Sequence, residues 1–148
     1  MKQCVLYVLI MFRLLSFFLT GNAIAEQRTV FAAQNNVAFY KENGKIGLQT
    51  IDGTILYAAE FDGVGYFDAT EQANIYIGDK IGRIDRYGNV VVEPFLCHSI
   101  DAIPTNLASE VIPEYILLVS WFDDNNQKFM RFMSIEGEWV SEIVFDLM

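Results

Sequence analysis

Two similar segments of the sequence indicate the fold: NGKIGLQTIDG at residues 43–53 and GDKIGRIDRYG at residues 78–88. An offset of 35 residues brings them into register. The matching positions are Lys45 with Lys80, Ile46 with Ile81, Gly47 with Gly82, Gly53 with Gly88, and Ile55-Leu56 with Val90-Val91. Self-similarity at a period of roughly 20–50 residues is typical of chains built from repeated structural units. The sequence therefore predicts at least two copies of one small unit.

Turn signals separate runs of β-branched and aromatic residues in both copies. The turn dipeptides are Asn43-Gly44, Asp52-Gly53, Gly78-Asp79 and Gly88-Asn89. Because Asn and Gly tolerate the positive φ angles that tight hairpins require, each dipeptide predicts a reversal of the chain. The runs on either side, such as VAFYK and KIGLQTI around the first dipeptide, are predicted strands.

A third, less regular copy follows toward the C-terminus. Its predicted elements are a strand at 115–122, a turn at 123–127, a strand at 128–135, a turn at 136–138 and a final strand at 139–145. Two prolines in residues 101–113 predict a loop or a short helical turn before it. The most helix-like segment, 69–76, runs directly into a predicted strand.

The predicted fold class is all-β: a curved antiparallel meander of about three repeated hairpin units, left open or closed into a partial barrel. A lone hairpin cannot bury its apolar face in water, whereas neighbouring hairpins can share a core. Gly47 and Gly82 follow the apolar residue of each copy and indicate a close backbone approach, a bulge or a bend. The residues expected inside are Ile46, Leu48, Ile81, Ile84 and Val91.

These phrases resemble the WG-repeat family. The residues that carry the resemblance are Gly44-Lys45-Ile46-Gly47, Asp52-Gly53, Glu60-Phe61-Asp62-Gly63-Val64 and Phe67, then Asp79-Lys80-Ile81-Gly82, Ile84-Asp85-Arg86-Tyr87-Gly88-Asn89, Val90-Val91-Val92-Glu93-Pro94-Phe95 and Ile100. It covers residues 37–100 well and 115–145 in outline. Ile46 and Ile81 stand where the family has its name-giving tryptophan, so a large apolar side chain is kept. The resemblance implies an all-β repeat module that serves in binding.

The N-terminus has the features of a secretory signal peptide. Lys2 precedes an apolar run at residues 4–19, and Ala23-Ile24-Ala25 supplies a cleavage site of the small-x-small type. We therefore expect residues 1–25 to be a signal peptide cleaved after Ala25. Residues 26–148 are then expected to form a single domain, secreted or periplasmic.

A charge interrupts the apolar run of this signal at Arg13. A charged residue is costly within a bilayer, and a start at Met11 would move it into the basic head of a shorter signal. An uncleaved membrane anchor is the alternative, although the run is short for a span.

The chain is acidic, with a net charge of −9. Cleavage after Ala25 would leave eight of the ten cationic residues and all nineteen acidic ones, a net charge of −11. This charge repels nucleic acid phosphates and anionic lipid head groups, so no nucleic acid is expected as a partner and a membrane only if the signal is uncleaved. It would attract a basic protein; plain solubility is the alternative explanation of the charge, and the oligomeric state stays open.

Cleavage would also leave Cys97 as the only cysteine, which excludes an intramolecular disulfide. We expect the thiol to be buried; pairing with another chain is the alternative. Its neighbour His98 does not make a convincing nucleophile–base pair, because adjacent side chains on a strand point to opposite faces.

No motif for a catalytic elbow, a phosphate loop or a zinc protease is present, so neither a cofactor nor a metal is expected. Acidic and aromatic side chains gather in the segment EFDGVGYFD and at a polar turn, and such residues can form the rim of a protein interface. The alternative for the aromatic residues is a place in the core or in cross-strand pairs. The candidate partner-binding residues are Glu60, Asp62, Tyr66, Phe67, Asp68, Asp123 and Asp124.

The sequence thus favours a secreted, non-catalytic protein-binding module. A sharper form of this hypothesis is an acidic immunity-type inhibitor of a basic toxin, because opposite charges speed association. The alternatives are an envelope-associated structural protein, held by Cys97 or by an uncleaved N-terminus, and a glycan hydrolase that uses paired carboxylates such as Glu60, Asp62 and Asp68.

Overall fold

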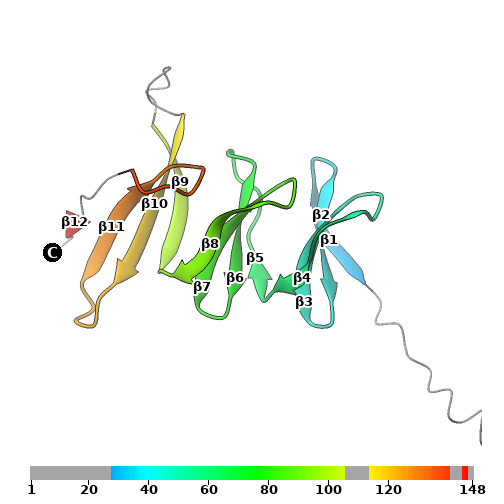
Figure 1. Cartoon of the computed structure of the whole chain (residues 1–148), viewed down its shortest axis with the longest axis horizontal. Coiled ribbons are helices and arrows are strands. Elements are labelled where there is room, and N and C mark those ends of the chain that lie inside the picture. The colour runs from blue at the N-terminus through cyan, green and yellow to red at the C-terminus, as the bar shows by residue number, and fades with distance from the viewer. Residues whose placement is uncertain (1–27, 106–113, 141–144, 147–148) are drawn as a thin grey trace, which may run out of the picture.

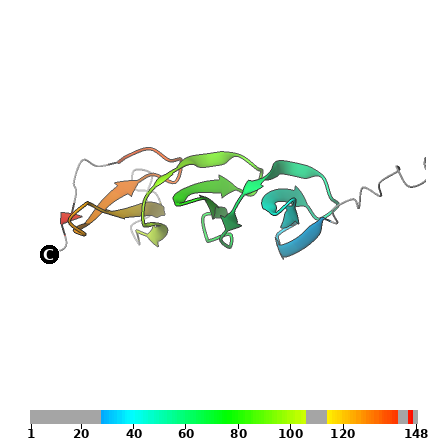
Figure 2. The same cartoon turned by 90° about the horizontal axis from the view of Figure 1, so that it is seen from below.

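The computed structural model describes residues 28–105, 114–140 and 145–146. In this part of the chain every regular element is a β-strand, and the strands form three antiparallel sheets that follow one another in a row (Figure 1). Figure 2 shows the same succession of sheets along the long axis after a 90° turn. The predicted signal peptide and its cleavage site lie outside the described residues. Within those residues, no helix has the length and apolarity needed to cross a membrane.

Each sheet is a four-stranded meander in which consecutive strands are neighbours. The first sheet contains β1 (Thr29–Gln34), β2 (Val37–Glu42), β3 (Lys45–Thr50) and β4 (Ile55–Phe61). The second contains β5 (Gly63–Val64), β6 (Gln72–Ile77), β7 (Lys80–Asp85) and β8 (Val90–Leu96). The third contains β9 (Ser99–Pro104), β10 (Tyr115–Phe122), β11 (Lys128–Met133) and β12 (Phe145–Asp146). The prediction of an all-β meander of three hairpin units is confirmed, and no sheet closes into a barrel.

Five turns of the described chain share one hydrogen-bond pattern. They span residues 50–54, 68–72, 85–89, 123–127 and 134–138. In each, the first residue donates its N–H to the carbonyl of the fifth, and the fourth donates to the carbonyl of the first. The first residue is Asp, Ser or Thr, and its side-chain oxygen accepts a backbone N–H of the same turn, as Asp85 does from Asn89 at 2.8 Å. The fourth residue has a positive φ, which favours glycine or asparagine there.

The matched hairpins β3–β4 and β7–β8 also share a defect. Pairing slips between Leu48 and Gln49 in the first sheet and between Arg83 and Ile84 in the second, which are equivalent positions at the 35-residue offset. The slip leaves Leu56 and Val91 as the extra residues of the two bulges. A bulge bends a strand and increases its twist.

The close backbone approach predicted from the two strand glycines is confirmed at Gly82, whereas Gly47 lies against a side chain. A Cβ on Gly82 would lie 2.5 Å from the carbonyl oxygen of Val92, and one on Gly47 would lie 2.6 Å from the ring of Tyr40. Both distances are shorter than a real Cβ contact. Gly82 therefore has no room for a side chain against the backbone of β8, whereas a side chain at Gly47 would have to displace the ring of Tyr40.

Two apolar cores lie at the two junctions between sheets. The first joins Val37, Phe39, Leu48 and Phe61 of the first sheet to Phe67, Ala73, Ile75 and Ile84 of the second unit. The second joins Ile81 and Val92 of the second sheet to Ile100, Leu117, Val119 and Met133 of the third. The middle sheet therefore contributes to both cores, because each sheet buries its apolar residues against a neighbour.

The turns that follow β7 and β11 each rest on the preceding sheet. A Cβ on Gly88 would lie 2.6 Å from the carbonyl oxygen of Leu56, and one on Gly137 would lie 2.4 Å from that of Val91. Leu56 and Val91 are equivalent bulge residues, so both junctions are built by the same contact. Gly53, the equivalent glycine of the first sheet, has no described atom within 4 Å of such a Cβ.

Three expectations need correction. Residues 101–104 are not a loop but part of β9, an edge strand, where Pro104 removes no hydrogen bond that the sheet needs. Val91 is only half-buried, because the bulge turns Val92 toward the core in its place. Ile46 is also only partly buried against the first core, whereas Leu48, Ile81 and Ile84 are buried as predicted.

The predicted final strand, 139–145, lies partly outside the described residues. Trp139 forms a single bridge to Met133, and β12 pairs with Phe129 and Met130 of β11. The strand β1 was not predicted, because most of its residues are exposed and leave no alternating apolar pattern in the sequence.

Candidate functional site

The candidate segment from Glu60 to Asp68 carries the chain from the first sheet into the second. Glu60 is exposed near the end of β4. Asp62 pairs with Lys45 Nζ at 2.5 Å and accepts the N–H of Gly78 at 2.8 Å. These two hydrogen bonds, that of Lys45 foremost, lower the pKa of the Asp62 carboxyl. The Asp62 carboxylate therefore connects the turn after β6, in the second sheet, to the start of β3 in the first sheet.

Two adjacent aromatic residues in this segment have opposite environments. Phe67 is buried and stacks on Phe39 with ring centroids 5.3 Å apart, so it belongs to the first core and is withdrawn from the predicted binding surface. Tyr66 is 83% exposed. An aromatic side chain held out in solvent is a candidate contact for a partner.

Asp68 is tied to a buried cation. Its carboxylate pairs with the guanidinium of Arg83, whose side chain is 2% exposed, and accepts the N–H of Thr70 at 2.8 Å. Burial alone would raise the pKa of Asp68, but the hydrogen bonds from Arg83 and Thr70 and the charge of Arg83 hold it below its ordinary value. A carboxyl with a lowered pKa is suited to neutralising Arg83 and unsuited to the role of general acid at neutral pH.

Arg83 is the centre of a polar network between the second and third sheets. It donates to Gln72 Oε1 at 3.0 Å, to Asn74 Oδ1 at 3.3 Å and to Thr70 Oγ1 at 3.1 Å. The two amides continue across the junction: Gln72 Nε2 donates to the carbonyl of Ile135 at 2.8 Å, and Asn74 Nδ2 donates to that of Ile100 at 3.0 Å. The network thus fixes the third sheet to the second.

A groove of about 270 Å³ opens beside this network. The second unit contributes one wall and β9 contributes the other. The lining residues are Gly65, Tyr66, Asp68, Asn74, Arg83, Ile100, Asp101 and Ala102. This volume lies just below the roughly 300–1,000 Å³ of small-molecule pockets, so the groove suits a side chain or two of a partner. We call it the Tyr66–Asp101 groove.

The charge in this groove that is not neutralised by an ion pair is that of Asp101. Asp68 neutralises Arg83 within the groove. Asp101 is exposed, and it forms neither an ion pair nor a side-chain hydrogen bond within residues 28–105 and 114–140. The groove therefore offers one carboxylate and one aromatic ring without partners, a combination that suits a cationic side chain.

The two remaining candidate acids lie elsewhere. Asp123 and Asp124 belong to the turn between β10 and β11 in the third sheet. Asp123 accepts the N–H groups of Asn125 at 2.9 Å and Gln127 at 2.8 Å, so it shapes its own turn. The structure does not bring this pair together with the segment from Glu60 to Asp68, nor does it place either acid in the groove.

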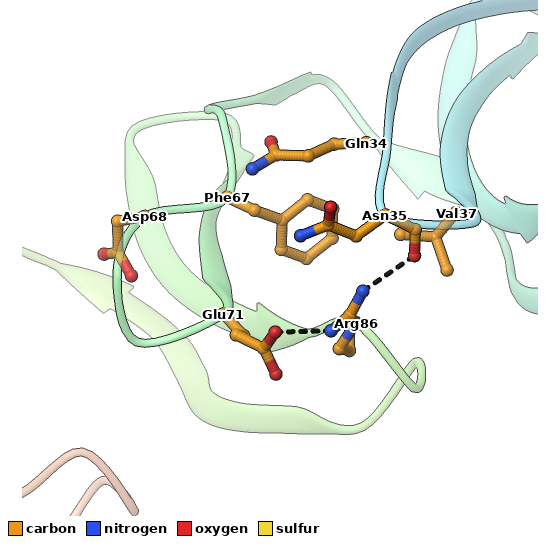
Figure 3. Close-up of a pocket in the computed structure, with 7 residues that line it drawn as sticks. All are labelled: Gln34, Asn35, Val37, Phe67, Asp68, Glu71 and Arg86. Carbon is orange, nitrogen blue, oxygen red and sulfur yellow. Dashed lines mark hydrogen bonds and ion pairs between the residues drawn. The ribbon is translucent and has the colours of Figure 1, made fainter.

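A second, smaller cavity separates the first and second sheets (Figure 3). Its volume of about 20 Å³ is room for a single water molecule. Arg86 closes it by pairing with Glu71 and donating to the carbonyl of Asn35 at 2.7 Å. Figure 3 shows these bonds beside the ring of Phe67. We interpret this cavity as part of the junction between the two sheets.

Cys97 and His98 lie between β8 and β9, and no hydrogen bond between their two side chains is present in the described part of the chain. Cys97 packs against the second core, and burial raises the pKa of its thiol to about 11, which keeps it protonated at neutral pH. His98 is exposed, and its ring meets Phe122 edge-on at 4.9 Å. The described residues contain no group of three or more His, Cys, Asp or Glu side chains able to hold a metal ion.

Three polar residues of the groove are not predicted as site residues from the sequence: Asn74, Arg83 and Asp101. One signal was present, because Arg83 falls on the buried Leu48 at the 35-residue offset. A charge at a core position of a repeated unit indicates a buried polar network. No local signal marks Asp101, since β9 meets the second sheet only through tertiary structure.

Comparison of the chain with protein-family models, with curated proteins and with solved structures finds no match.

Proposed function

We propose that the chain is a non-catalytic protein-binding module that takes a basic segment of its partner into the Tyr66–Asp101 groove. The observation that carries this proposal is the unneutralised Asp101 carboxylate facing the same groove as the exposed ring of Tyr66. A Lys or Arg side chain can stack on a tyrosine face and pair with a carboxylate at once. Anionic ligands are disfavoured, because Arg83 already has its partners and both other charges in the groove are negative.

The charge of the whole chain supports the same class of partner. A net charge of −9 attracts a basic protein from a distance and repels acidic ones. We place the module in the periplasm or outside the cell on the basis of the predicted signal peptide, and among the WG-repeat proteins on the basis of the sequence resemblance. An immunity-type inhibitor of a basic toxin is the specific form of this proposal that the charge favours.

A titration with a simple cation-bearing probe tests the groove. We expect hexalysine to shift the backbone amide signals of Tyr66 and Asp101 in the nitrogen-15 NMR spectrum of the chain. Hexalysine acetylated on every Nε should leave them unchanged, because acetylation removes the charge that both contacts need.

Matched variants separate the groove from the general acidity of the chain. Tyr66→Ala and Asp101→Asn should each weaken hexalysine binding at least fivefold. Asp79→Asn alters an exposed acid outside the groove and should leave binding within twofold. Equal weakening by Asp101→Asn and Asp79→Asn would mean that only net charge acts, and the proposal would fail.

A further inference from the structure

The two ends of the row of sheets are complementary, and each presents one half of the contact that joins the sheets inside the chain. Inside the chain, Gly88 rests on the carbonyl of Leu56, and Gly137 rests on that of Val91. In each case the turn of one sheet meets the bulge of the sheet before it. Figure 1 shows the loops after β3, β7 and β11 projecting toward the same end of the row.

The first sheet carries the turn half of this contact without a described partner. Its turn at 50–54 has the same hydrogen bonds as the turns at 85–89 and 134–138, and Gly53 has a φ of 92° against 89° for both Gly88 and Gly137. Gly88 and Gly137 are half-buried, whereas Gly53 is exposed. The second residue of the turn differs in burial in the same way. Ile135 of the third sheet packs against the second core, whereas the equivalent Ile51 of the first sheet is 66% exposed.

The third sheet carries, at the other end, the residue that is equivalent in position to the two bulge residues. Leu56 and Val91 each lie six residues after the first residue of their turn, and Val140 lies six residues after Ser134. The bridge between Met133 and Trp139 matches the pairs Gln49–Ile55 and Ile84–Val90 that precede the two bulge residues. Leu56 and Val91 are half-buried, whereas Val140 is 59% exposed.

We infer that the chain associates head to tail with a second copy of itself, the turn at 50–54 of one copy resting on the backbone at Val140 of the next. The occupant follows from the fold, because the same pair of surfaces already meets twice within the chain. Such a contact joins two different faces, so it can extend into a linear chain of copies. The Tyr66–Asp101 groove lies between the second and third sheets, so this inference is independent of the proposed partner.

Sedimentation velocity over a concentration series tests this inference. Reducing agent would keep Cys97 as a thiol, and salt above 0.1 M would limit the screening length to under about 10 Å and so reduce the repulsion between acidic copies. We expect the weight-average mass of the wild type to rise with concentration. Ile51→Asp and Val140→Asp should each be monomeric, because each removes one of the two faces that every contact needs.

Mixing the two variants gives the decisive result. An equimolar mixture of Ile51→Asp and Val140→Asp retains one intact face of each kind, so it should reach the mass of a dimer and go no further. Leu96→Asp, which adds the same charge at a residue 63% exposed, should behave as the wild type. A wild type that stays monomeric up to about 1 mM, a mixture that stays monomeric, or an equal effect of Leu96→Asp would overturn the inference.

Discussion

Arg83 shows how a single residue can change the nature of a junction between sheets. It occupies the place that Leu48 has in the first sheet, and both side chains are buried. A buried guanidinium is tolerated only when it is paired and its N–H groups have acceptors, and Asp68, Thr70, Gln72 and Asn74 supply these. The second junction therefore combines an apolar core with a polar network.

Removing the partner of this cation should be costly. Breaking a buried ion pair by deleting one member typically costs about 3–5 kcal/mol. Asp68 keeps 32% side-chain exposure, which lets water relieve part of the loss, so we expect Asp68→Ala to lower the free energy of unfolding by about 2–3 kcal/mol. Urea unfolding checks this, with Asp79→Ala, an exposed turn acid, as a control of small effect. Equal effects of the two variants would show that the network does not stabilise the fold.

The same ion pair predicts a pH dependence. The pKa of Asp68 is lower in the folded chain than the roughly 3.9 of an unfolded aspartate, so the folded state binds fewer protons. The stabilisation is therefore complete above that unfolded value and is lost as the pH falls through the folded pKa. Urea midpoints between pH 2.5 and 6 should fall more steeply for the wild type than for Asp68→Asn. Parallel curves for the two proteins would contradict this.

At the scale of the element, the repeated turn governs both the hairpins and the junctions. An Asp, Ser or Thr opens each such turn and accepts its N–H groups, and a residue with positive φ closes it. In the second and third sheets the closing glycine also meets the preceding sheet. The turn thus sets the direction of the strands and the spacing of the sheets at once.

Three glycine substitutions separate these two roles. Gly53→Ala should lower the free energy of unfolding by about 1–2 kcal/mol, because alanine is strained at positive φ. Gly88→Ala and Gly137→Ala share this strain and should cost about 1–3 kcal/mol more, because their Cβ atoms would meet a backbone carbonyl of the preceding sheet. Thermal and urea unfolding measure the difference. Three equal losses would mean that the turns do not bear on the junctions.

The sequence predicts those turns and strands whose conformation is set by residues close to them in the chain. Four turns can be predicted from the sequence because Gly or Asn occupies the position with positive φ: 50–54, 85–89, 123–127 and 134–138. The turn at 68–72 cannot, since Glu71 holds a φ of 58° within a segment of helical appearance. The groove cannot be predicted from local sequence, because its residues Tyr66, Arg83 and Asp101 come from three separate segments.

At the scale of the whole molecule, three small sheets replace one large core. Each sheet covers its neighbour, and the row keeps an extended surface for its size (Figures 1 and 2). A surface of this kind suits the binding of another protein better than the enclosure of a small substrate. The same arrangement places the exposed turn at 50–54 and the exposed Val140 at opposite ends of the row, and these are the surfaces of the inferred head-to-tail association.

The mass of the intact protein tests the predicted export and cleavage of the signal peptide. Intact-mass spectrometry of the protein from the periplasm or the medium should give a chain that begins at Glu26. A mass that retains residues 1–25, in the membrane fraction, would make this an anchored envelope protein and would favour the structural alternative.

The proposed binding of a basic protein in the Tyr66–Asp101 groove can be tested on the natural partner itself. The exported fraction is passed over the immobilised chain, the retained protein is identified and purified, and its affinity is measured by calorimetry for the wild type, Asp101→Asn and Asp79→Asn. We expect a basic partner whose affinity falls at least tenfold with Asp101→Asn and less than twofold with Asp79→Asn. No retained protein, or a partner that binds all three chains equally well, would contradict it.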